Sequence, residues 1–394
     1  MTLQREIPPH AARKLAELAP DLVRHIDEAV AAGHPADSTL SSHFRSHREF
    51  GSRDRRFVSN LVFSFFRWRG WTRNLDIGPA LVLSHRLDAS EIHPSITILA
   101  GKPNLQPLAA LSLDEKAATV GGVHVEDLVP GWFHEVLYEP DIHLRKCIEA
   151  FQKRPPTWLR IAKGRTEDLV RELESKGIRC QRHETMHEAV AVTGSPVIPS
   201  PHVEIQDLAS QSVGLICDPK AGESWWDVCA GSGGKSLHLA DLMGNQGSIL
   251  ATDIRKSALE ELQRRAKRAG ATSIKAHRAG SAAREEFDGV LVDAPCSGIG
   301  TWSRNPDARW RTSADDVRNR AGVQAELLRE SSGKVRAGGR LVYSVCTITG
   351  LETIEVINAF LRDRKDFTLD AEPRWIWPWD GPCDGMFVAR MRRS

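Results

Sequence analysis

Strand-like apolar runs and amphipathic helical segments alternate regularly through the second half of this 394-residue chain. The alternation predicts strands at residues 225–229, 248–252, 289–292 and 340–345. Helices are expected over residues 235–243, 257–268, 314–335 and 351–364, and an added edge strand over 386–391. Strands connected through helices pair in parallel, so this part of the chain should form a doubly wound α/β sheet.

A glycine-rich loop joins the first of these strands to its helix. The loop reads Cys229-Ala230-Gly231-Ser232-Gly233-Gly234-Lys235. Glycines let a backbone approach a ligand closely, and the following helix N-terminus offers N–H groups to a carboxylate or phosphate. The next strand ends at Asp253, a carboxylate suited to both ribose hydroxyls of a nucleoside. Loop and acid together fit S-adenosylmethionine.

A phosphate-binding loop is the alternative interpretation. Residues 229–236 differ from G-x-x-x-x-G-K-S only in their first residue, and Asp293 after the strand 289–292 would then hold magnesium. However, Cys229 replaces the glycine at which that loop turns, and Asp253 would have no role. We therefore rank this nucleotide-hydrolase interpretation second.

Two cysteines follow predicted strands further along the chain. Cys296 lies in the sequence Asp-Ala-Pro-Cys-Ser-Gly and Cys346 in Tyr-Ser-Val-Cys-Thr. The carboxyl ends of parallel strands open into one crevice, so both thiols are expected to face the same pocket. A single cysteine is more often a small buried residue than a nucleophile, but a pair beside a cofactor loop favours covalent catalysis.

The glycine-rich loop and the two cysteine motifs resemble those of the RNA cytosine-5 methyltransferases. The resemblance implies S-adenosylmethionine as cofactor, bound by residues 229–235 with Asp253 and Asp293. It implies that Cys346 attacks C6 of cytosine, which makes C5 nucleophilic, and that Cys296 helps to release the product. Lys235 is the expected cation beside the thiolate, and Asp293 the expected donor toward N3 of the base.

Three positions depart from the family pattern. The loop usually reads Cys-Ala-Ala-Pro-Gly-Gly-Lys, whereas this chain has Gly231 and Ser232 in the third and fourth places. Residues 274–280 lack the carboxylate that usually lies near the adenine, and Val345 replaces a threonine. Because the altered loop is more flexible, a noncatalytic RNA-binding assembly factor of the same fold stays open as an alternative.

The N-terminal part predicts an RNA-binding helical domain. Apolar residues at helical spacing run through residues 10–75, and a dense arginine-rich stretch with aromatic residues covers 45–73. Residues 51–69 resemble the NusB-type domain of some bacterial ribosomal RNA cytosine methyltransferases. Small-subunit ribosomal RNA is therefore the favoured substrate, and transfer RNA stays open. The arginine-rich stretch alone fits ordinary solvated helix faces equally well. The predicted RNA contacts are Arg53, Arg55, Arg56, Arg160 and Arg304.

Residues 298–310 resemble the family's substrate-side loop after the second thiol. Arg304 is expected to contact phosphate, and Trp302 or Trp310 to stack on a base; packing at the surface is the equally weighted alternative. A target base must leave its stack to reach a thiol, which favours an unpaired or readily opened RNA site.

These patterns divide the chain into three predicted domains. Residues 1–125 form a NusB-like helical domain with a linker, and residues 126–200 a small RNA-recognition-like α/β module. The expected linker region is the stretch 101–130 with its prolines and glycines, of which part can alternatively pack as short helices. In that module we expect strands over 155–161 and 189–193 and a helix over 166–176. Residues 201–394 form the Rossmann-like catalytic methyltransferase domain.

Composition limits the remaining possibilities. The 7 cysteines have no Cys-x-x-Cys spacing, so we expect reduced thiols and neither a metal site nor a disulfide framework. No apolar run approaches the roughly 20 residues needed to span a bilayer, and residues 1–9 lack the apolar stretch of a secretory signal. The net charge of +2 does not identify a partner by itself. We expect a cytoplasmic monomer.

Overall fold

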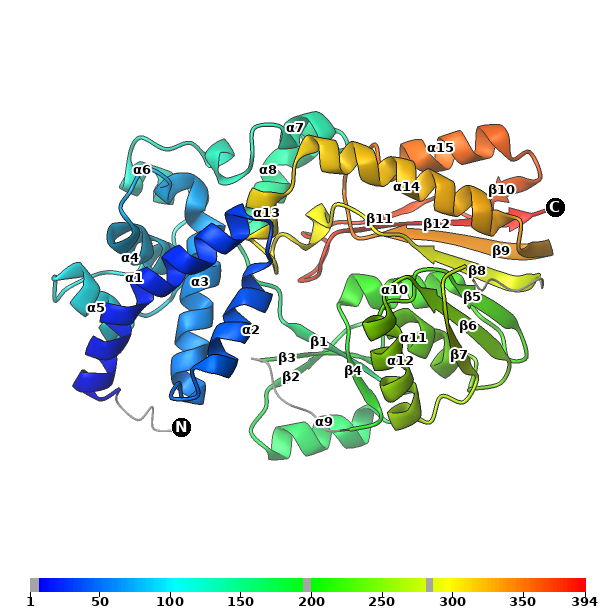
Figure 1. The fold of residues 1–394 in the computed structure, drawn as a ribbon, viewed down its shortest axis with the longest axis horizontal. Coiled ribbons are helices and arrows are strands. Elements are labelled where there is room, and N and C mark those ends of the chain that lie inside the picture. Colours follow the sequence, from blue (N-terminus) through cyan, green and yellow to red (C-terminus); the bar gives the residue numbers. More distant parts are fainter. Residues whose placement is uncertain (1–6, 194–199, 281–285) are drawn as a thin grey trace. The chain divides into compact units, whose positions relative to one another are not determined.

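The computed structural model describes residues 7–193, 200–280 and 286–394. The chain forms two compact units, drawn in Figure 1. The first contains residues 1–135, 140–154 and 302–313, and the second contains residues 136–139, 155–301 and 314–394. One prediction concerns residues outside the described ranges, namely the comparison of the N-terminal segment with secretory signals, which includes residues 1–6.

The first unit is helical, which confirms the prediction for the N-terminal part. Its core contains Ile26, Leu61, Val62, Phe66 and Leu81, all almost inaccessible to solvent. Its helices are α1 (Pro9–Ala31), α2 (Ala36–Ser46), α3 (Ser52–Thr72), α4 (Ile77–Asp88), α5 (Pro94–Ala100), α6 (Leu113–Val120), η1 (Val125–Leu128), α8 (Pro140–Phe151) and α13 (Ala308–Arg311), and the short α7 (Phe133–Val136) ends at its boundary.

The predicted linker after residue 101 is part of this helical unit. Leu108, Leu113, Val125 and Leu128 are buried, and the segment forms α6 and η1. Part of the stretch therefore packs as short helices, which was the alternative for it, because its apolar residues pack into the unit despite the prolines and glycines nearby. The predicted boundary at residue 125 also differs from that of the unit, since α8 packs with it through Phe151 against Phe133.

Residues 302–313 belong to the helical unit although they follow Cys296 by only a few positions. Arg309 is fully buried, donates hydrogen bonds to the carbonyls of Leu128 (2.8 Å) and Phe151 (3.2 Å), and lies over the ring of Trp302. Trp302 is itself fully buried, and Trp310 donates to the carbonyl of Phe66. Both tryptophans therefore pack against other parts of the helical unit, and the burial of Trp302 differs from the surface packing that was the alternative to base stacking.

A small antiparallel sheet opens the second unit and confirms the strands and helix predicted between residues 155 and 193. It contains β1 (Thr157–Ile161), β2 (Cys180–Arg182), β3 (Ala189–Val192) and β4 (Val203–Ile205), in the order β2-β3-β1-β4. Leu159 and Val190 on one face pack against α9 (Thr166–Ser175), whereas Trp158 and Ala191 on the other pack with α10 (Leu208–Cys217). Both faces are covered, so this sheet does not offer the open platform that an RNA-recognition module uses.

The main sheet confirms the predicted doubly wound α/β class. Its strand order is β10-β12-β9-β8-β5-β6-β7, with β11 also paired to β12. The strands from β5 to β9 pair in parallel. They are β5 (Ser224–Asp227), β6 (Ser248–Asp253), β7 (Ile274–Arg278), β8 (Phe287–Asp293), β9 (Val335–Val345), β10 (Phe367–Leu369), β11 (Arg374–Ile376) and β12 (Met386–Arg393).

The strand β12 corrects one prediction. Residues 386–391 were expected at the edge of the sheet, but β12 lies between β9 and β10 and is antiparallel to both. The strands β10 and β11 contain 3 residues each. In such short strands the alternation of apolar and polar residues is too brief to be recognised in the sequence. The strands that pair with β12 on this side were therefore not predicted.

Helices cover both faces of the main sheet (Figure 1). Residues of α10 and α11 (Gly234–Leu242) pack with Trp225, Leu291 and Val342, and α12 (Lys256–Ala269) adds Leu262 on the same side. The opposite face carries Trp226 and Tyr343 and is covered by α14 (Ala314–Ser332) and α15 (Ile354–Asp363). The chain reverses its winding direction between β5 and β8, and ligands of such sheets bind at this point, beyond the carboxyl ends of the strands.

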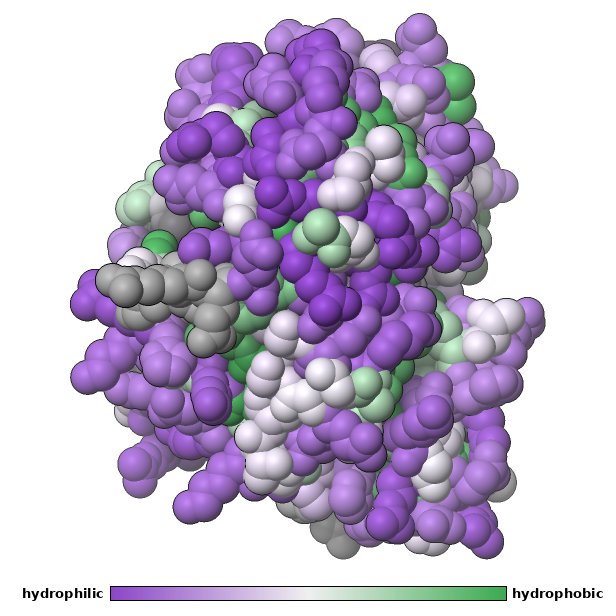
Figure 2. Space-filling model, turned by 90° about the vertical axis from the view of Figure 1, so that its right-hand side faces the viewer, coloured by the Kyte–Doolittle hydropathy of each residue, from purple (hydrophilic) through white to green (hydrophobic). Residues whose placement is uncertain are grey.

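The surface drawn in Figure 2 is mostly hydrophilic, with small apolar and weakly polar areas among polar residues. No helix in the described ranges combines the length and the apolar character that crossing a membrane requires.

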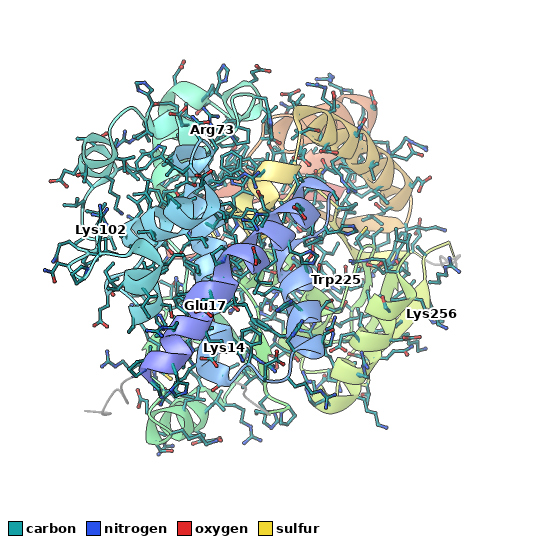
Figure 3. All side chains as sticks on the ribbon, turned by 60° about the vertical axis from the view of Figure 1, so that its left-hand side comes forward. Lys14, Glu17, Arg73, Lys102, Trp225 and Lys256 are labelled. Carbon is teal, nitrogen blue, oxygen red and sulfur yellow. The ribbon has the colours of Figure 1, made fainter. Side chains whose placement is uncertain are left out.

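Gly289 gives a test of the packing in the main sheet. It faces Trp225 on the neighbouring strand, and an added Cβ would lie 2.4 Å from the buried indole ring, which Figure 3 draws within the fold. We expect Gly289→Ala to lower the free energy of unfolding by about 1–3 kcal/mol. Gly322 in α14 has no atom within 4 Å of such a Cβ, so Gly322→Ala should instead add up to about 1 kcal/mol. Thermal unfolding of both variants would be compared, and equal melting temperatures would contradict the packing argument.

Candidate active site

The glycine-rich loop connects β5 to α11 with two glycines in the left-handed region. Gly231 has φ +56° and Gly233 has φ +90°. A Cβ on Gly233 would lie 2.6 Å from Leu262 of α12, so this turn needs glycine both for its backbone and for its packing. The loop therefore brings the N-terminus of α11 to the carboxyl edge of the sheet.

Asp253 at the end of β6 holds the loop in place. Its Oδ2 accepts a hydrogen bond of 2.9 Å from the N–H of Gly231, and its Oδ1 accepts one of 2.8 Å from the N–H of Arg255. The Arg255 guanidinium also contacts this carboxylate, and these bonds outweigh burial and lower the pKa of Asp253. The predicted ribose-binding acid is thus ionised and fixed next to the loop.

Arg265 of α12 was not identified from the sequence. Its guanidinium donates to the carbonyl oxygen and to the hydroxyl of Ser232, at 2.7 and 2.9 Å, and forms an ion pair of 2.5 Å with Glu204. The flexibility expected from Gly231 and Ser232 is therefore countered by bonds on both residues. Arg265 is 33 positions from Ser232, and no local pattern reveals so distant a partner.

Asp227 lies beneath the loop at the end of β5 and is fully buried. Its Oδ2 accepts a hydrogen bond of 2.6 Å from Ser236, while its Oδ1 has no hydrogen-bond partner among the described residues. Burial raises the pKa of Asp227 to about 7. The Asp227 carboxyl group, which lies under the N-terminal end of α11, is consequently protonated below about pH 7.

The two predicted catalytic thiols lie side by side. The Sγ atoms of Cys296 and Cys346 are 3.3 Å apart, and both side chains are half-buried. Lys235 donates to Asp293 Oδ2 at 2.8 Å, and Ser344 donates to Asp293 Oδ1 at 2.7 Å. Residues that follow β5, β8 and β9 therefore meet at one edge, as predicted.

The contacts of Asp293 differ from its predicted chemistry. Both of its carboxylate oxygens accept hydrogen bonds, one from the Lys235 ammonium and one from Ser344. Both oxygens are therefore occupied by donors in this structure, and the donation of a proton toward N3 of a base stays a prediction. The sequence pattern placed the residue correctly but did not show which partners would occupy its oxygens.

The electrostatic surroundings of the two thiols differ. A hydrogen bond with Cys346 and burial raise the pKa of Cys296 well above its ordinary value. Burial opposes the charge of Lys235, but Asp293 and the Cys346 thiolate raise the pKa of Lys235 above its ordinary value. Cys296 thus holds its proton more tightly than an ordinary thiol does.

Cys229 differs from these two thiols. Burial raises the pKa of Cys229 to about 12, with further contributions from Asp227 and Asp293. This residue of the loop therefore carries a protonated and unreactive thiol.

The adenine side of the predicted cofactor site lies beyond β7. This strand ends with His277 and Arg278 and carries no carboxylate, in line with the sequence. Its backbone continues to Ala279, whose N–H donates to the carbonyl of Asp253. Residues 281–285, which come next, lie outside the described residues.

The predicted RNA contacts fall into different environments. Arg53 and Arg56 are exposed on α3, whereas Arg55 is half-buried, donates to the carbonyl of Phe50 and lies over the ring of Phe44. Arg304 is half-buried in the segment 302–313. Arg53, Arg56 and Arg304 remain predicted contacts, and the aromatic residues between the arginines of α3 belong largely to the core.

Arg160 requires a correction. Its side chain is only 4% exposed, donates to Gln206 at 2.8 Å and forms an ion pair of 3.5 Å with Asp241. The strand β1 is covered on both faces, so this guanidinium is not available to a phosphate. An arginine in a strand is expected on an open face, and the sequence did not reveal the second covering layer.

The basic residues of α12 are largely paired with acids. Arg264 bonds Glu261 at 2.5 Å, and Arg268 bonds Glu204 at 3.2 Å. Lys256, which Figure 3 draws at the outside of the fold, is 3.7 Å from Glu260. The basic face of α12 is thus partly neutralised, which is typical of a solvated helix face.

A family model described as 16S rRNA methyltransferase RsmB/F matches residues 214–392 of this chain. The "Probable ribosomal RNA small subunit methyltransferase B" of Bacillus subtilis is 34% identical over 300 residues, which are 69% of this chain and 66% of that protein. The "Ribosomal RNA small subunit methyltransferase B" of Serratia proteamaculans is 30% identical over 265 residues, 62% of each chain. The chain thus spans just under two thirds of the length of these relatives.

Solved structures share the fold. A methyltransferase homolog protein from Pyrococcus horikoshii is 27% identical, with a TM-score of 0.59 over 72% of this chain and 100% of that chain. The protein PH0851 has a TM-score of 0.74 at 24% identity, covering 95% of this chain and 99% of that chain. The second similarity extends beyond the main sheet to almost the whole chain.

Arg265 should control the affinity of the glycine-rich loop for S-adenosylmethionine. We expect Arg265→Gln to weaken binding about 5- to 10-fold, which corresponds to about 1 kcal/mol, because Ser232 loses two hydrogen bonds. Arg264→Gln is the matched control, since Arg264 is exposed and pairs only locally with Glu261. Calorimetric titration would measure both affinities. Equal affinities in the two variants would contradict the proposed support of the loop.

Asp227 should make stability depend on pH. Its pKa is raised in the folded state, so the folded protein holds this proton more tightly and loses stability as the pH rises from about 4 to about 7. Asp227→Asn removes this titration. The difference in melting temperature, variant minus parent, should therefore be several degrees larger at pH 8 than at pH 5. Thermal unfolding at a series of pH values would test this, and parallel curves would count against it.

Proposed function

Because this chain belongs to the 16S rRNA methyltransferase RsmB/F family, whose methyl donor is S-adenosylmethionine, we propose that it methylates C5 of cytosine in RNA. The observation that carries the proposal is the thiol pair, whose Sγ atoms are 3.3 Å apart, together with the electrostatic interaction between Cys346 and Lys235. A methyltransferase that acted on a heteroatom would not require two thiols in this position.

The residues at the carboxyl edge fit the cofactor. The turn at Gly231 and Gly233 exposes the start of α11, where the first N–H groups of a helix have no partner within it. Asp253 provides an ionised carboxylate one strand away. We assign the methionine carboxylate to the loop 229–235 and the ribose to Asp253. When bound, S-adenosylmethionine supplies an electrophilic methyl group.

In the proposed reaction the Cys346 thiolate forms a bond from Sγ to C6 of cytosine. The electron pair of the C5–C6 double bond then becomes available at C5, which takes up the methyl group. Lys235 favours the thiolate before attack, and Asp293 keeps the lysine in place. Removal of the proton from C5 restores the double bond as Sγ leaves C6.

Cys296 is proposed to assist this last step. Its hydrogen bond with Cys346 is the largest contribution to its raised pKa. Once Cys346 is bonded to carbon, its sulfur carries no negative charge and no longer opposes ionisation of Cys296. Cys296 therefore becomes a base only after the adduct has formed, which is the order that catalysis requires.

The names of the curated relatives support small-subunit ribosomal RNA as the substrate. The exposed Arg53 and Arg56 of α3 are the proposed phosphate contacts. A noncatalytic assembly factor is the second candidate because of the departures at Gly231, Ser232 and Val345. The nucleotide-hydrolase interpretation loses its support, since Lys235 is engaged by Asp293 and the family is one of methyltransferases.

Replacement of the two thiols tests the reaction. With labelled S-adenosylmethionine and transcribed 16S ribosomal RNA, Cys346→Ala should lower methyl transfer by at least about 1,000-fold, because no adduct forms. Cys296→Ala should form the adduct and release it slowly, so a denaturation-resistant protein–RNA band should accumulate. Gel electrophoresis and mapping of 5-methylcytosine would measure both effects.

The matched control is Cys180→Ala, which changes a half-buried thiol of the small sheet. This variant should methylate RNA like the parent protein. RNA binding with no methyl transfer by the parent protein would favour the assembly factor, and transfer that survives in Cys346→Ala would exclude the proposed nucleophile.

A further inference from the structure

We propose that Glu352 is a positioning residue that fixes the two thiol-bearing loops relative to each other. Glu352 lies in the turn between Cys346 and α15 and is fully buried. It contacts neither sulfur through a hydrogen bond, but it binds the residue that follows each cysteine. The inference deepens the proposed function and rests on it for the chemical role of the thiols.

The Glu352 carboxylate accepts hydrogen bonds from both loops. On the Cys296 side, the N–H of Ser297 donates to Oε1 at 2.8 Å and the Ser297 hydroxyl donates to Oε2 at 2.5 Å. On the Cys346 side, the Thr347 hydroxyl donates to Oε2 at 3.1 Å. The hydroxyls of Ser297 and Thr347 also contact each other at 3.0 Å. One side chain thus binds the nearest neighbour of each cysteine.

Further hydrogen bonds fix the Glu352 side chain itself. The Thr349 hydroxyl donates to Oε2 at 3.1 Å, and the amide of the buried Gln324 in α14 donates to Oε1 at 3.0 Å. The same amide donates to the carbonyl of Pro295, directly before Cys296. The Tyr343 hydroxyl lies 3.1 Å from Gln324 Oε1 and 2.6 Å from the carbonyl of Glu352. Residues of β9, α14 and both loops therefore form one buried polar network.

Among the described residues, the hydrogen-bond donors to the Glu352 carboxylate are hydroxyls, a backbone N–H and a side-chain amide, all of them neutral. Removing the acid would leave buried donors unsatisfied on both loops. Glu352 also contributes to the raised pKa of Cys296.

Thiol cross-linking tests the positioning without RNA or cofactor. Diamide oxidises two adjacent thiols to a disulfide, with their two hydrogens passing to the diazene, which becomes a hydrazine. Two sulfurs 3.3 Å apart need only a small movement to bond. We expect the Cys296–Cys346 disulfide to form at least fivefold more slowly in Glu352→Gln than in the parent protein. Peptide mass spectrometry would measure the rate of disulfide formation. Glu355→Gln is the matched control, because Glu355 is exposed three positions away.

A second readout separates positioning from general stability. In Glu352→Gln, kcat of methyl transfer should fall at least tenfold, while KM for S-adenosylmethionine stays within about twofold, because the cofactor loop is held by Asp253 and Arg265 instead. Should Glu352→Gln unfold, the double variant Ser297→Ala with Thr347→Val removes the hydroxyl donors of both loops and keeps the acid and the N–H of residue 297. The same slow cross-linking is expected.

The proposal is overturned if folded Glu352→Gln, or the double variant in its place, cross-links at the parental rate. Slow cross-linking in Glu352→Gln supports positioning even if the parent protein methylates no RNA. Failure of the positioning and failure of the proposed function therefore give different results.

Discussion

The ion pair between Lys235 and Asp293 is the contact on which the arrangement of the candidate site depends. Lys235 follows β5 through the glycine-rich loop, and Asp293 ends β8, so the 2.8 Å contact crosses the point where the sheet reverses its winding. Ser344 on β9 binds the other oxygen of Asp293. A largely buried ion pair stabilises a fold little by itself, because desolvation costs about as much as the attraction returns. Its effect here is to hold a cation next to Cys346 with only small freedom of movement.

Layers of covering helices decide which charged residues can take part in binding. The main sheet places its polar strand ends at one edge and buries both faces, so that reactive groups can only gather beyond the carboxyl ends. The small sheet is also covered twice, and Arg160 consequently has a structural role with Gln206 and Asp241. In the helical unit the aromatic residues of α3 form the core, and Arg67 pairs with Asp88 at 3.0 Å. Only part of the arginine-rich stretch is thus left for RNA.

The sequence was informative where the relevant information was local. Parallel strands buried on both faces appear as continuous apolar runs, and the glycine loop and both cysteine motifs lie directly at strand ends, so the fold class and the grouping of Lys235, Asp293, Cys296 and Cys346 could be predicted. Contacts between residues far apart in the sequence could not be predicted. Glu352 is 55 positions from Ser297, and residues 302–313 pack with helices more than 150 positions earlier, as Arg309 does with Leu128. The solvent exposure of individual side chains could not be predicted either, as the burial of Trp302 and Arg160 illustrates.

Two identical thiols at 3.3 Å must behave differently for the proposed reaction to turn over. If both were thiolates, their repulsion would separate them, and if both were protonated, neither would attack cytosine. The hydrogen bond with Cys346 and the acid Glu352 both raise the pKa of Cys296, so its environment differs from that of Cys346. In the proposed reaction, bond formation at C6 ends the contribution of the Cys346 thiol to this raised pKa. The same pair would then supply a nucleophile first and a base afterwards.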